Sequence, residues 1–340
     1  IAYIGAFSAL LAAIIATKQT DIKKILAYST MSQLGYMFIA VGLGFYSSGL
    51  FHVFTHAFFK AMLFMGAGGV IIALHHEQNI FNIAKHRAIL PIISATFLIG
   101  VIAISGIPPF SGFFSKDAIL AAAFQEGHYL IYGIALFTAF LTAFYMFRLY
   151  FVVFVTPNHH KKEYVYTSKT ITFPLVVLAV GAVTAGFLNL PSIFGGTHMV
   201  DTWLGSLNSK TITLSHSTEY ILMALSVLVA SFGIFIAYKK YARFDLEKPE
   251  LEVGFVGRKL YVDELYDILF VKTSKAISCF IDKVLDAKII DAFIMKSSIY
   301  FVAIGRKVAL IQNANVRFYA LFMLAGMTCI FVYLYLKLGL

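Results

Sequence analysis

The sequence predicts an all-α fold, a polytopic transmembrane helix bundle, and three observations support this fold class. Of the 340 residues, 60% are apolar and only 13% are charged, and the mean hydropathy is +0.82. A soluble domain has about 25% charged residues, so this chain has more apolar surface than a water-exposed fold can bury. Apolar runs of membrane-spanning length recur along the chain, and basic residues gather in the short segments between them.

The apolar runs define the expected helices, since about 20 apolar residues in a helix cross the hydrocarbon core of a bilayer. They lie near residues 1–17, 25–44, 48–74, 89–123, 129–155, 171–190, 218–238 and 317–338. The fourth run is too long for one straight helix and contains Pro108-Pro109. Because two prolines remove two backbone donors, we expect a discontinuous helix there, restarted after a cap at Ser111 or Ser115.

Basic residues mark every second connection between these runs. They gather in 18–24, 75–88, 156–170 and 239–259, whereas 45–47, 124–128 and 191–217 contain only Lys210. This alternation follows the positive-inside rule if the basic loops are cytoplasmic, and it requires 89–123 to be one crossing. Because the net charge of +10 is distributed over such loops, we expect a lipid bilayer as a partner and no nucleic acid.

The sequence offers few ligands for a metal or a cofactor. Its two cysteines, Cys279 and Cys329, lie in apolar segments, which excludes a Cys-ligated iron–sulfur cluster, a four-Cys zinc site and a disulfide scaffold. No phosphate-binding glycine loop, nucleophile elbow or HExxH motif occurs. We therefore expect no cofactor and no metal in this chain. The chain begins inside an apolar run without Met, so we expect it to be the C-terminal part of a longer protein.

The stretch from about 260 to 305 has a different pattern. Charged residues recur throughout it, and apolar residues occur at helical intervals, as in Ile277, Phe280, Ile281 and Val284. Such a sequence lies along a membrane or protein surface, either as one long lateral amphipathic helix or as two or three shorter interfacial helices. The expected domains are a transmembrane bundle over 1–255, this lateral helix on the cytoplasmic side over 256–310, and a terminal transmembrane anchor over 311–340.

Ionisable side chains inside the third run form the first candidate site. His52, His56 and Lys60 are spaced by four residues, and each step of four rotates by only about 40° around a helix. All three therefore lie on one stripe, with Lys60 about halfway across the membrane. Because intramembrane charge is expensive, this stripe predicts a proton or ion path. The alternative is that the histidines hydrogen-bond neighbouring helices.

The broken run carries the second candidate site, because Lys116 and Asp117 follow the proline break within two turns. Unwound backbone at membrane depth is tolerated only where protein or a water-filled cavity satisfies it, and transporters build midplane ion sites on broken helices. The alternative is that Lys116 extends to the outer surface. Asp21 and Lys23 stand at the cytoplasmic mouth of the second run, where they either modulate the path or only orient the helix. We expect Asp117 as well to lie at a channel mouth or to modulate the path.

Four segments of the sequence resemble a known family. KQTDIKKILAYSTMSQLGYM, HVFTHAFFKAMLFMGAGGVI, HHEQNIF and ISGIPPFSGFFSKDAIL are similar to the antiporter-like membrane subunits of respiratory complex I, and most similar to subunit L of NADH-quinone oxidoreductase. The resemblance is close over residues 1–155 and looser, by layout, to the C-terminus. It implies two inverted five-helix repeats, of which this chain would hold most of the second and a C-terminal extension.

The resemblance also implies roles for individual residues and partners. Lys60 matches the central-axis lysine, Lys116 the lysine of the second broken helix, His52 and His56 the histidines before the central lysine, and Lys23 a basic residue at a channel mouth. The chain would be a non-redox, proton-translocating subunit in a bacterial inner membrane. NADH, FMN, iron–sulfur clusters and quinone would bind to partner subunits. The lateral helix would contact adjacent antiporter-like subunits as a mechanical rod or as a clamp, and we favour the clamp because a long helix lying free on the membrane is too compliant to transmit precise displacements.

Two other functions share the same spans and buried lysines. One is a subunit of a multisubunit cation/proton antiporter, which uses a gradient and no redox reaction. The other is a subunit of a membrane-bound hydrogenase complex. The long lateral helix favours the complex I subunit, and neighbouring genes for NADH-binding, quinone-binding or nickel–iron subunits would discriminate among the three.

Overall fold

The computed structural model describes residues 1–86, 88–156, 163–164, 168–191, 194–196, 199–204, 209–244, 255–310 and 315–338. The predicted all-α class is confirmed: in these ranges the only strands are the two-residue β1 (Ala88–Ile89) and β2 (Glu163–Tyr164). The chain forms two compact units, Ile1–Tyr261 and Val262–Leu340. Arg87, Lys161, Lys162 and Lys248, which belong to the basic loops predicted to be cytoplasmic, lie outside the described residues.

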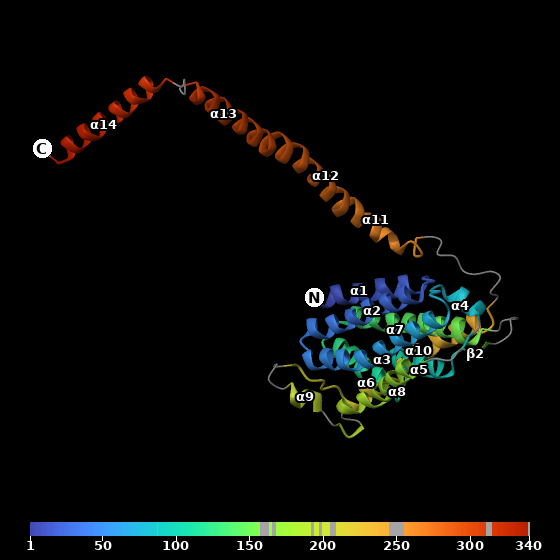
Figure 1. Ribbon diagram of the computed structural model, residues 1–340. Helices are drawn as coiled ribbons and strands as arrows, with labels where there is room; N and C mark the ends of the chain where they lie inside the picture. The colour runs from blue at the N-terminus through green and yellow to red at the C-terminus, as the bar shows by residue number, and fades with distance from the viewer. Residues whose placement is uncertain are drawn as a thin grey trace. The chain divides into compact units, whose positions relative to one another are not determined.

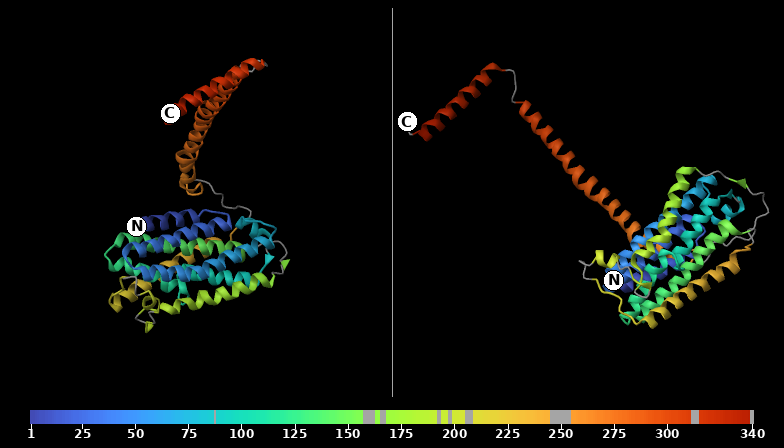
Figure 2. Two further views of the ribbon diagram at one scale, coloured as in Figure 1. Left: turned by 60° about the vertical axis from the view of Figure 1, so that its left-hand side comes forward. Right: turned by 90° about the horizontal axis from the view of Figure 1, so that it is seen from below.

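The first unit is a helix bundle whose long helices run side by side in Figures 1 and 2. Its helices are α1 (Ala2–Ala16), α2 (Ile22–Leu43), α3 (Tyr46–Ala73), α4 (Ile80–His86), α5 (Pro91–Ser105), α6 (Ser111–Gln125), α7 (Tyr129–Tyr150), α8 (Lys169–Thr184), α9 (Met199–Trp203) and α10 (His216–Tyr241). A π-helical turn, Phe151–Val155, extends α7, and a 3₁₀ turn, Ala185–Asn189, extends α8.

The membrane-spanning runs predicted from composition coincide with these helices. Across the described residues, six helices are long and apolar enough to cross a membrane: α2, α3, α7 and α8 with their extensions, α10 and α14 (Val316–Leu338). Shorter apolar helices, α1 and α5, account for the first predicted run and for the first half of the fourth. Local signals set the ends: Asp21 caps α2, and Gly44 ends it in the left-handed conformation at φ 89°.

The fourth predicted run forms two helices, because α5 ends at Ser105 and α6 begins at Ser111. Gly106 adopts φ 76° and ends α5, and Pro108-Pro109 occupies the connection. The expected cap by Ser111 or Ser115 is wrong. Phe110, in an extended conformation, occupies the N-cap position and forms no side-chain cap. Both serines therefore lie inside α6, and their hydroxyls are buried.

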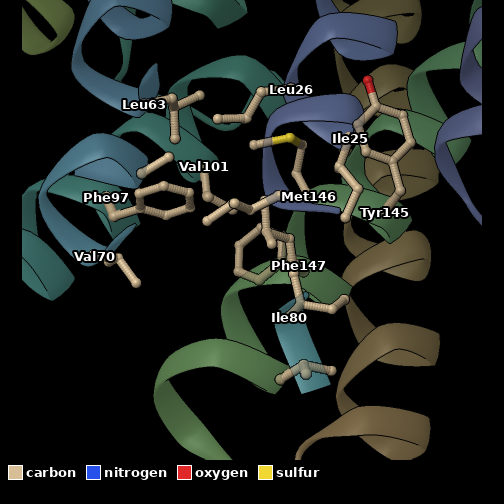
Figure 3. Close-up of a cluster of buried hydrophobic side chains, with 14 of the residues drawn as sticks. Ile25, Leu26, Leu63, Val70, Ile80, Phe97, Val101, Tyr145, Met146 and Phe147 are labelled. Atoms are coloured by element: carbon tan, nitrogen blue, oxygen red, sulfur yellow. The ribbon is translucent and has the colours of Figure 1, made fainter. Parts of the chain in front are cut away.

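Buried apolar side chains from several helices form the main core of the bundle. Figure 3 shows part of it, where Leu26 of α2, Leu63 of α3, Phe97 of α5 and Met146 of α7 point toward one another. All four side chains are fully buried. This core holds α2, α3, α5 and α7 together beside the break in the fourth run, where Gly106 is buried and Pro108 and Pro109 are exposed.

The two halves of the broken run approach each other closely at Gly112. A Cβ atom built on Gly112 would collide with the carbonyl oxygen of Ala103 on α5. Since backbone atoms are involved, the collision can be relieved only by moving a helix.

We therefore expect Gly112→Ala to lower the stability of the bundle by about 1–3 kcal/mol, the usual cost of overpacking. Gly133→Ala is the matched control, because a Cβ on Gly133 of α7 meets nothing within 4 Å. Thermal unfolding of the purified protein in detergent measures the difference. Equal melting temperatures for the two variants would contradict the close approach.

The second unit contains one continuous helical run and a final helix. The run comprises α11 (Val262–Tyr266), a π-helical segment Asp267–Lys272, α12 (Thr273–Phe280), a second π-helical segment Ile281–Asp291 and α13 (Ala292–Ala309). The backbone stays right-handed and helical through each junction. The structure therefore contradicts the alternative of two or three separate helices. The lateral position of this run and the boundaries at 255/256 and 310/311 stay predictions.

Candidate functional site

The stripe predicted on the third run lies on α3 and is buried. His52, His56 and Lys60 are 0%, 9% and 5% exposed. The imidazole rings of His52 and His56 have centroids 6.2 Å apart. The ammonium of Lys60 lies 5.6 Å from the ring centroid of Phe64 and has no hydrogen-bond partner among the described residues. The amine is therefore enclosed by protein, one helical turn from His56.

The lysine of the broken run is also buried, and the break itself supplies its partner. The Nζ atom of Lys116 donates a hydrogen bond of 2.8 Å to the carbonyl oxygen of Ile104. Ile104 lies in the last turn of α5, where carbonyl groups lack intrahelical donors and the helix dipole is negative. The ring of Tyr36 lies 5.2 Å from the same Nζ atom. Only 3% of Lys116 is exposed, so this side chain does not extend to the surface.

Hydrogen bonds link side chains of three helices in the region of the two lysines. On one side of its ring, His52 Nδ1 lies 2.9 Å from Ser115 Oγ of α6. On the other, His52 Nε2 lies 3.1 Å from Gln33 Oε1 of α2. Thr55 Oγ1 lies 2.7 Å from Ser115 Oγ. We call these residues the buried polar cluster: Gln33, His52, Thr55, His56, Lys60, Ser115 and Lys116. Lys60, His56 and His52 follow one another on α3, and His52 bonds to Ser115, the sequence neighbour of Lys116.

Asp117 stands between this cluster and a larger pocket. Its carboxylate accepts a hydrogen bond of 3.1 Å from Ser226 of α10 and is almost fully buried. Asp117 and Lys116 both line a cavity of about 10 Å³, which is at the lower limit for holding one water molecule. Asp117 also lines a pocket of about 410 Å³, whose walls include Lys210, His216 and Glu219. One carboxylate thus borders both spaces.

The structure leaves Asp21 and Lys23 outside the buried polar cluster. Asp21 Oδ1 accepts hydrogen bonds from the backbone N–H groups of Lys23 at 2.8 Å and Lys24 at 3.3 Å. Asp21 is therefore the N-cap of α2, and the side chain of Lys23 is exposed. The role of both residues at a channel mouth stays a prediction.

Several polar side chains of the site were not predicted from the sequence. Gln33, Thr55 and Ser226 bind members of the site, and Ser115 was expected only as a helix cap. A signal existed for Gln33, because Ser29, Ser32 and Gln33 form a polar stripe at helical spacing within an apolar run. Among the described residues, no group of three or more His, Cys, Asp or Glu side chains is arranged to hold a metal ion.

Comparison with known proteins covers the region of this site. Residues 1–142 match the family described as NADH:quinone oxidoreductase/Mrp antiporter, transmembrane. The whole buried polar cluster and Asp117 lie in that range. Residues 1–142 belong to this family. Both buried lysines are therefore part of the NADH:quinone oxidoreductase/Mrp antiporter domain, as the resemblance of the motifs implied.

Named relatives of the domain extend the similarity beyond residue 142. The chain is 38% identical to chain 5 of the NAD(P)H-quinone oxidoreductase of Picosynechococcus, over 94% of this chain and 54% of that protein. It is 39% identical to subunit L of the NADH-quinone oxidoreductase of Escherichia coli, over 79% of this chain and 43% of that protein. The chain spans about half the length of the curated relatives it matches.

Two solved structures are similar in fold to this chain. The Mrp complex from Dietzia gives a TM-score of 0.53 at 19% identity, over 96% of this chain and 32% of that chain, which shows similarity of fold alone. The membrane-bound sulfane sulfur reductase, an archaeal respiratory membrane complex, gives a TM-score of 0.51 at 27% identity, over 68% of this chain and 43% of that chain.

Proposed function

We propose that this chain is a proton-translocating, non-redox membrane subunit of a bacterial NADH:quinone oxidoreductase. The observation that carries the proposal is the pair of buried lysines, which lie with two buried histidines and a buried serine inside a domain of the antiporter family. Buried amines are costly for a membrane protein, and such groups belong to ion pathways far more often than to scaffolds. Similarity to subunit L and to chain 5 supports the choice of complex.

Protons would move along the buried polar cluster from Lys60 toward Lys116. Burial disfavours the charged form of a lysine, so a buried amine can release and regain a proton that it would hold in water. A neutral imidazole accepts a proton at one ring nitrogen and releases one from the other, which suits His56 and His52 to the intervening steps. The hydroxyl of Ser115, on the same helix as Lys116, lies 2.9 Å from His52 Nδ1.

Release would follow through Asp117. The cavity shared by Lys116 and Asp117 has room for one water molecule, and the carboxylate also faces the larger pocket. A proton that leaves Lys116 would reach Asp117 through that water and then the pocket. Driving it against the membrane potential costs about 2.3 kcal/mol per 100 mV.

The driving reaction belongs to partner subunits. NADH, FMN, iron–sulfur clusters and quinone would bind there, and a change of charge at the end of the buried polar cluster would bias Lys60 between its protonated and neutral forms. The helical run 262–309 would lie on the cytoplasmic side and clamp adjacent antiporter-like subunits. The basic loops would face the cytoplasm.

Lys60→Met tests the proposal. Methionine keeps the length of the aliphatic stem and removes the amine, so we expect the fold to persist and proton translocation to fall about tenfold or more. The assay is NADH-driven acidification of proteoliposomes that contain the whole complex. Lys24→Met, on the exposed side of α2, is the matched control. Equal translocation by both variants would refute the role of Lys60.

A second candidate function is that of a subunit in a multisubunit cation/proton antiporter. It is supported by the family match, which also covers Mrp antiporters, and by the fold shared with the Mrp complex. The same proteoliposomes discriminate between the two. Proton movement that requires an imposed Na⁺ gradient and ignores NADH would favour the antiporter.

A further inference from the structure

An apolar groove on the surface of α7 and α10 lies apart from the buried polar cluster and from Asp117. It has a volume of about 320 Å³ and is lined by Gly133, Leu136, Phe137 and Phe140 of α7 and by Val229 and Phe232 of α10. The side chains of Phe137 and Phe232 are 52% and 57% exposed. The groove therefore lies on the outside of the bundle, on two helices of membrane-spanning length. We call it the α7–α10 groove.

The packing of the two helices shapes this groove. A Cβ atom built on Gly233 of α10 would lie 2.7 Å from the carbonyl oxygen of Phe140, so the two backbones are in contact there. On Gly133, two turns earlier on α7, such an atom meets nothing within 4 Å. The surface is thus hollow at Gly133 and closed at Gly233.

Aromatic rings form the walls of the groove and hold one another in place. The ring of Phe140 stacks with the ring of Phe137, with centroids 5.9 Å apart, and with the ring of Phe232, with centroids 5.8 Å apart. Because stacked rings stabilise each other's orientation, the groove is formed before any ligand enters it.

One stripe of α10 continues from the groove to a basic residue. Val229, Phe232, Ile236 and Lys239 follow at intervals of three and four residues, which places them on one face of the helix. The first two line the groove, and the last lies in the final turn of α10. A ligand that lies along this stripe therefore passes from apolar walls to a positive charge.

The end of the stripe is strongly basic. Lys239 and Lys240 lie in the last turn of α10, Arg243 follows two residues after the helix, and all three side chains are exposed. The one carboxylate of α10, Glu219, lies in the first turn, at the opposite end of the helix. The groove thus ends at a surface that attracts anions.

The length of the stripe matches one leaflet of a bilayer. From Val229 to Lys239, α10 rises by about 15 Å at 1.5 Å per residue. This is half of a hydrocarbon core of about 30 Å. A phospholipid whose phosphate lies at Lys239 therefore places its acyl chain in the groove at the level of Val229.

A flexible chain fits the groove better than a helix does. With its side chains, an α-helix is about 10 Å wide, and helix interfaces in membranes are enriched in small residues that allow close approach of the backbones. The walls of the groove are aromatic, and Gly133 is the one small residue that lines it. An acyl chain can pass between the rings and over Gly133.

We propose that the α7–α10 groove binds an anionic phospholipid of the leaflet at the basic end of α10. The acyl chain lies among Phe137, Phe140 and Phe232, and the phosphate accepts hydrogen bonds from Lys239 and Arg243. Net negative charge selects the lipid, because basic side chains at a membrane surface attract anionic headgroups. The site does not depend on the proposed function, since neither buried lysine takes part in it.

The test uses the whole complex in nanodiscs of phosphatidylglycerol, which is anionic, or of phosphatidylcholine, which is zwitterionic. A trace of the same lipid carries a photoactivatable group on its acyl chain. Cryo-electron microscopy locates the bound lipid, and mass spectrometry of peptides from α7 and α10 measures the labelling.

Two variants change the two ends of the site, and each has a matched control. Gly133→Leu fills the groove, whereas Gly68→Leu adds the same side chain on α3, where a Cβ atom also meets nothing within 4 Å. Lys239→Ala removes one basic group of the site, whereas Lys24→Ala removes an exposed lysine of α2.

We expect acyl-chain density between Phe137 and Phe232 and phosphate density beside Lys239. Labelling should be about fivefold stronger with phosphatidylglycerol than with phosphatidylcholine. It should fall about fivefold in Gly133→Leu and Lys239→Ala and match the wild type in both controls.

Three results would overturn the proposal. One is equal labelling of the wild type by the two lipids, a comparison that requires no variant to fold. Another is wild-type labelling in Gly133→Leu and Lys239→Ala. The third is a protein helix, instead of a lipid, in the groove of the whole complex.

Discussion

Replacing Lys116 by alanine is expected to reduce proton translocation by about 10²-fold or more in a fully assembled complex. The amine is the only side-chain group that binds the carbonyl oxygen of Ile104 at the end of α5 among the described residues, and alanine has no proton to exchange there. The measurement is the rate of NADH-driven proton uptake into proteoliposomes, with the yield of assembled complex determined on the same preparation.

Two controls separate transport from folding. Lys116→Ala removes a buried charge together with its stem, so the melting temperature of the complex reports any loss of packing. Lys24→Ala, on the exposed side of α2, reports the effect of losing a positive charge elsewhere. NADH oxidation in the presence of an uncoupler shows that the redox subunits remain active. Normal translocation by assembled Lys116→Ala would contradict the assigned role of this lysine.

Replacing His52 by leucine is expected to impair both translocation and stability, because His52 is the one residue that joins α2, α3 and α6 within the buried polar cluster. Leucine leaves Gln33 Oε1 without its bond to the imidazole and removes one partner of Ser115 Oγ. A buried polar atom without a partner costs about 1–3 kcal/mol, so His52→Leu should unfold at a lower temperature than the wild type. Translocation should fall about tenfold or more, since the relay between the lysines is interrupted.

His128→Leu is the control for this prediction, because His128 is partly exposed at the N-terminal end of α7 and its side chain forms no cap hydrogen bond. His52→Gln adds a second comparison. Glutamine can bind Gln33 and Ser115 but cannot carry a proton as imidazole does, so it should recover stability without recovering translocation. If His52→Gln translocates like the wild type, His52 only positions its neighbours.

Some features follow from the sequence because they depend on one helix at a time. The thickness of a bilayer fixes the length of an apolar run, so the helices α2, α3, α7, α8 and α10 could be located from hydropathy. Two consecutive prolines cannot continue a helix, which placed the break between α5 and α6. The period of 3.6 residues placed His52, His56 and Lys60 on one stripe, and the structure has all three buried on α3.

Other features depend on which helices are neighbours, and hydropathy contains no such information. The packing of α2, α3, α5 and α6 decides three contacts of the site. Lys116 binds the carbonyl oxygen of Ile104, Ser115 faces His52, and Gln33 binds the other side of the same ring. A sequence determines where polar side chains lie on a helix, whereas helix packing decides which of them share a space closed to lipid.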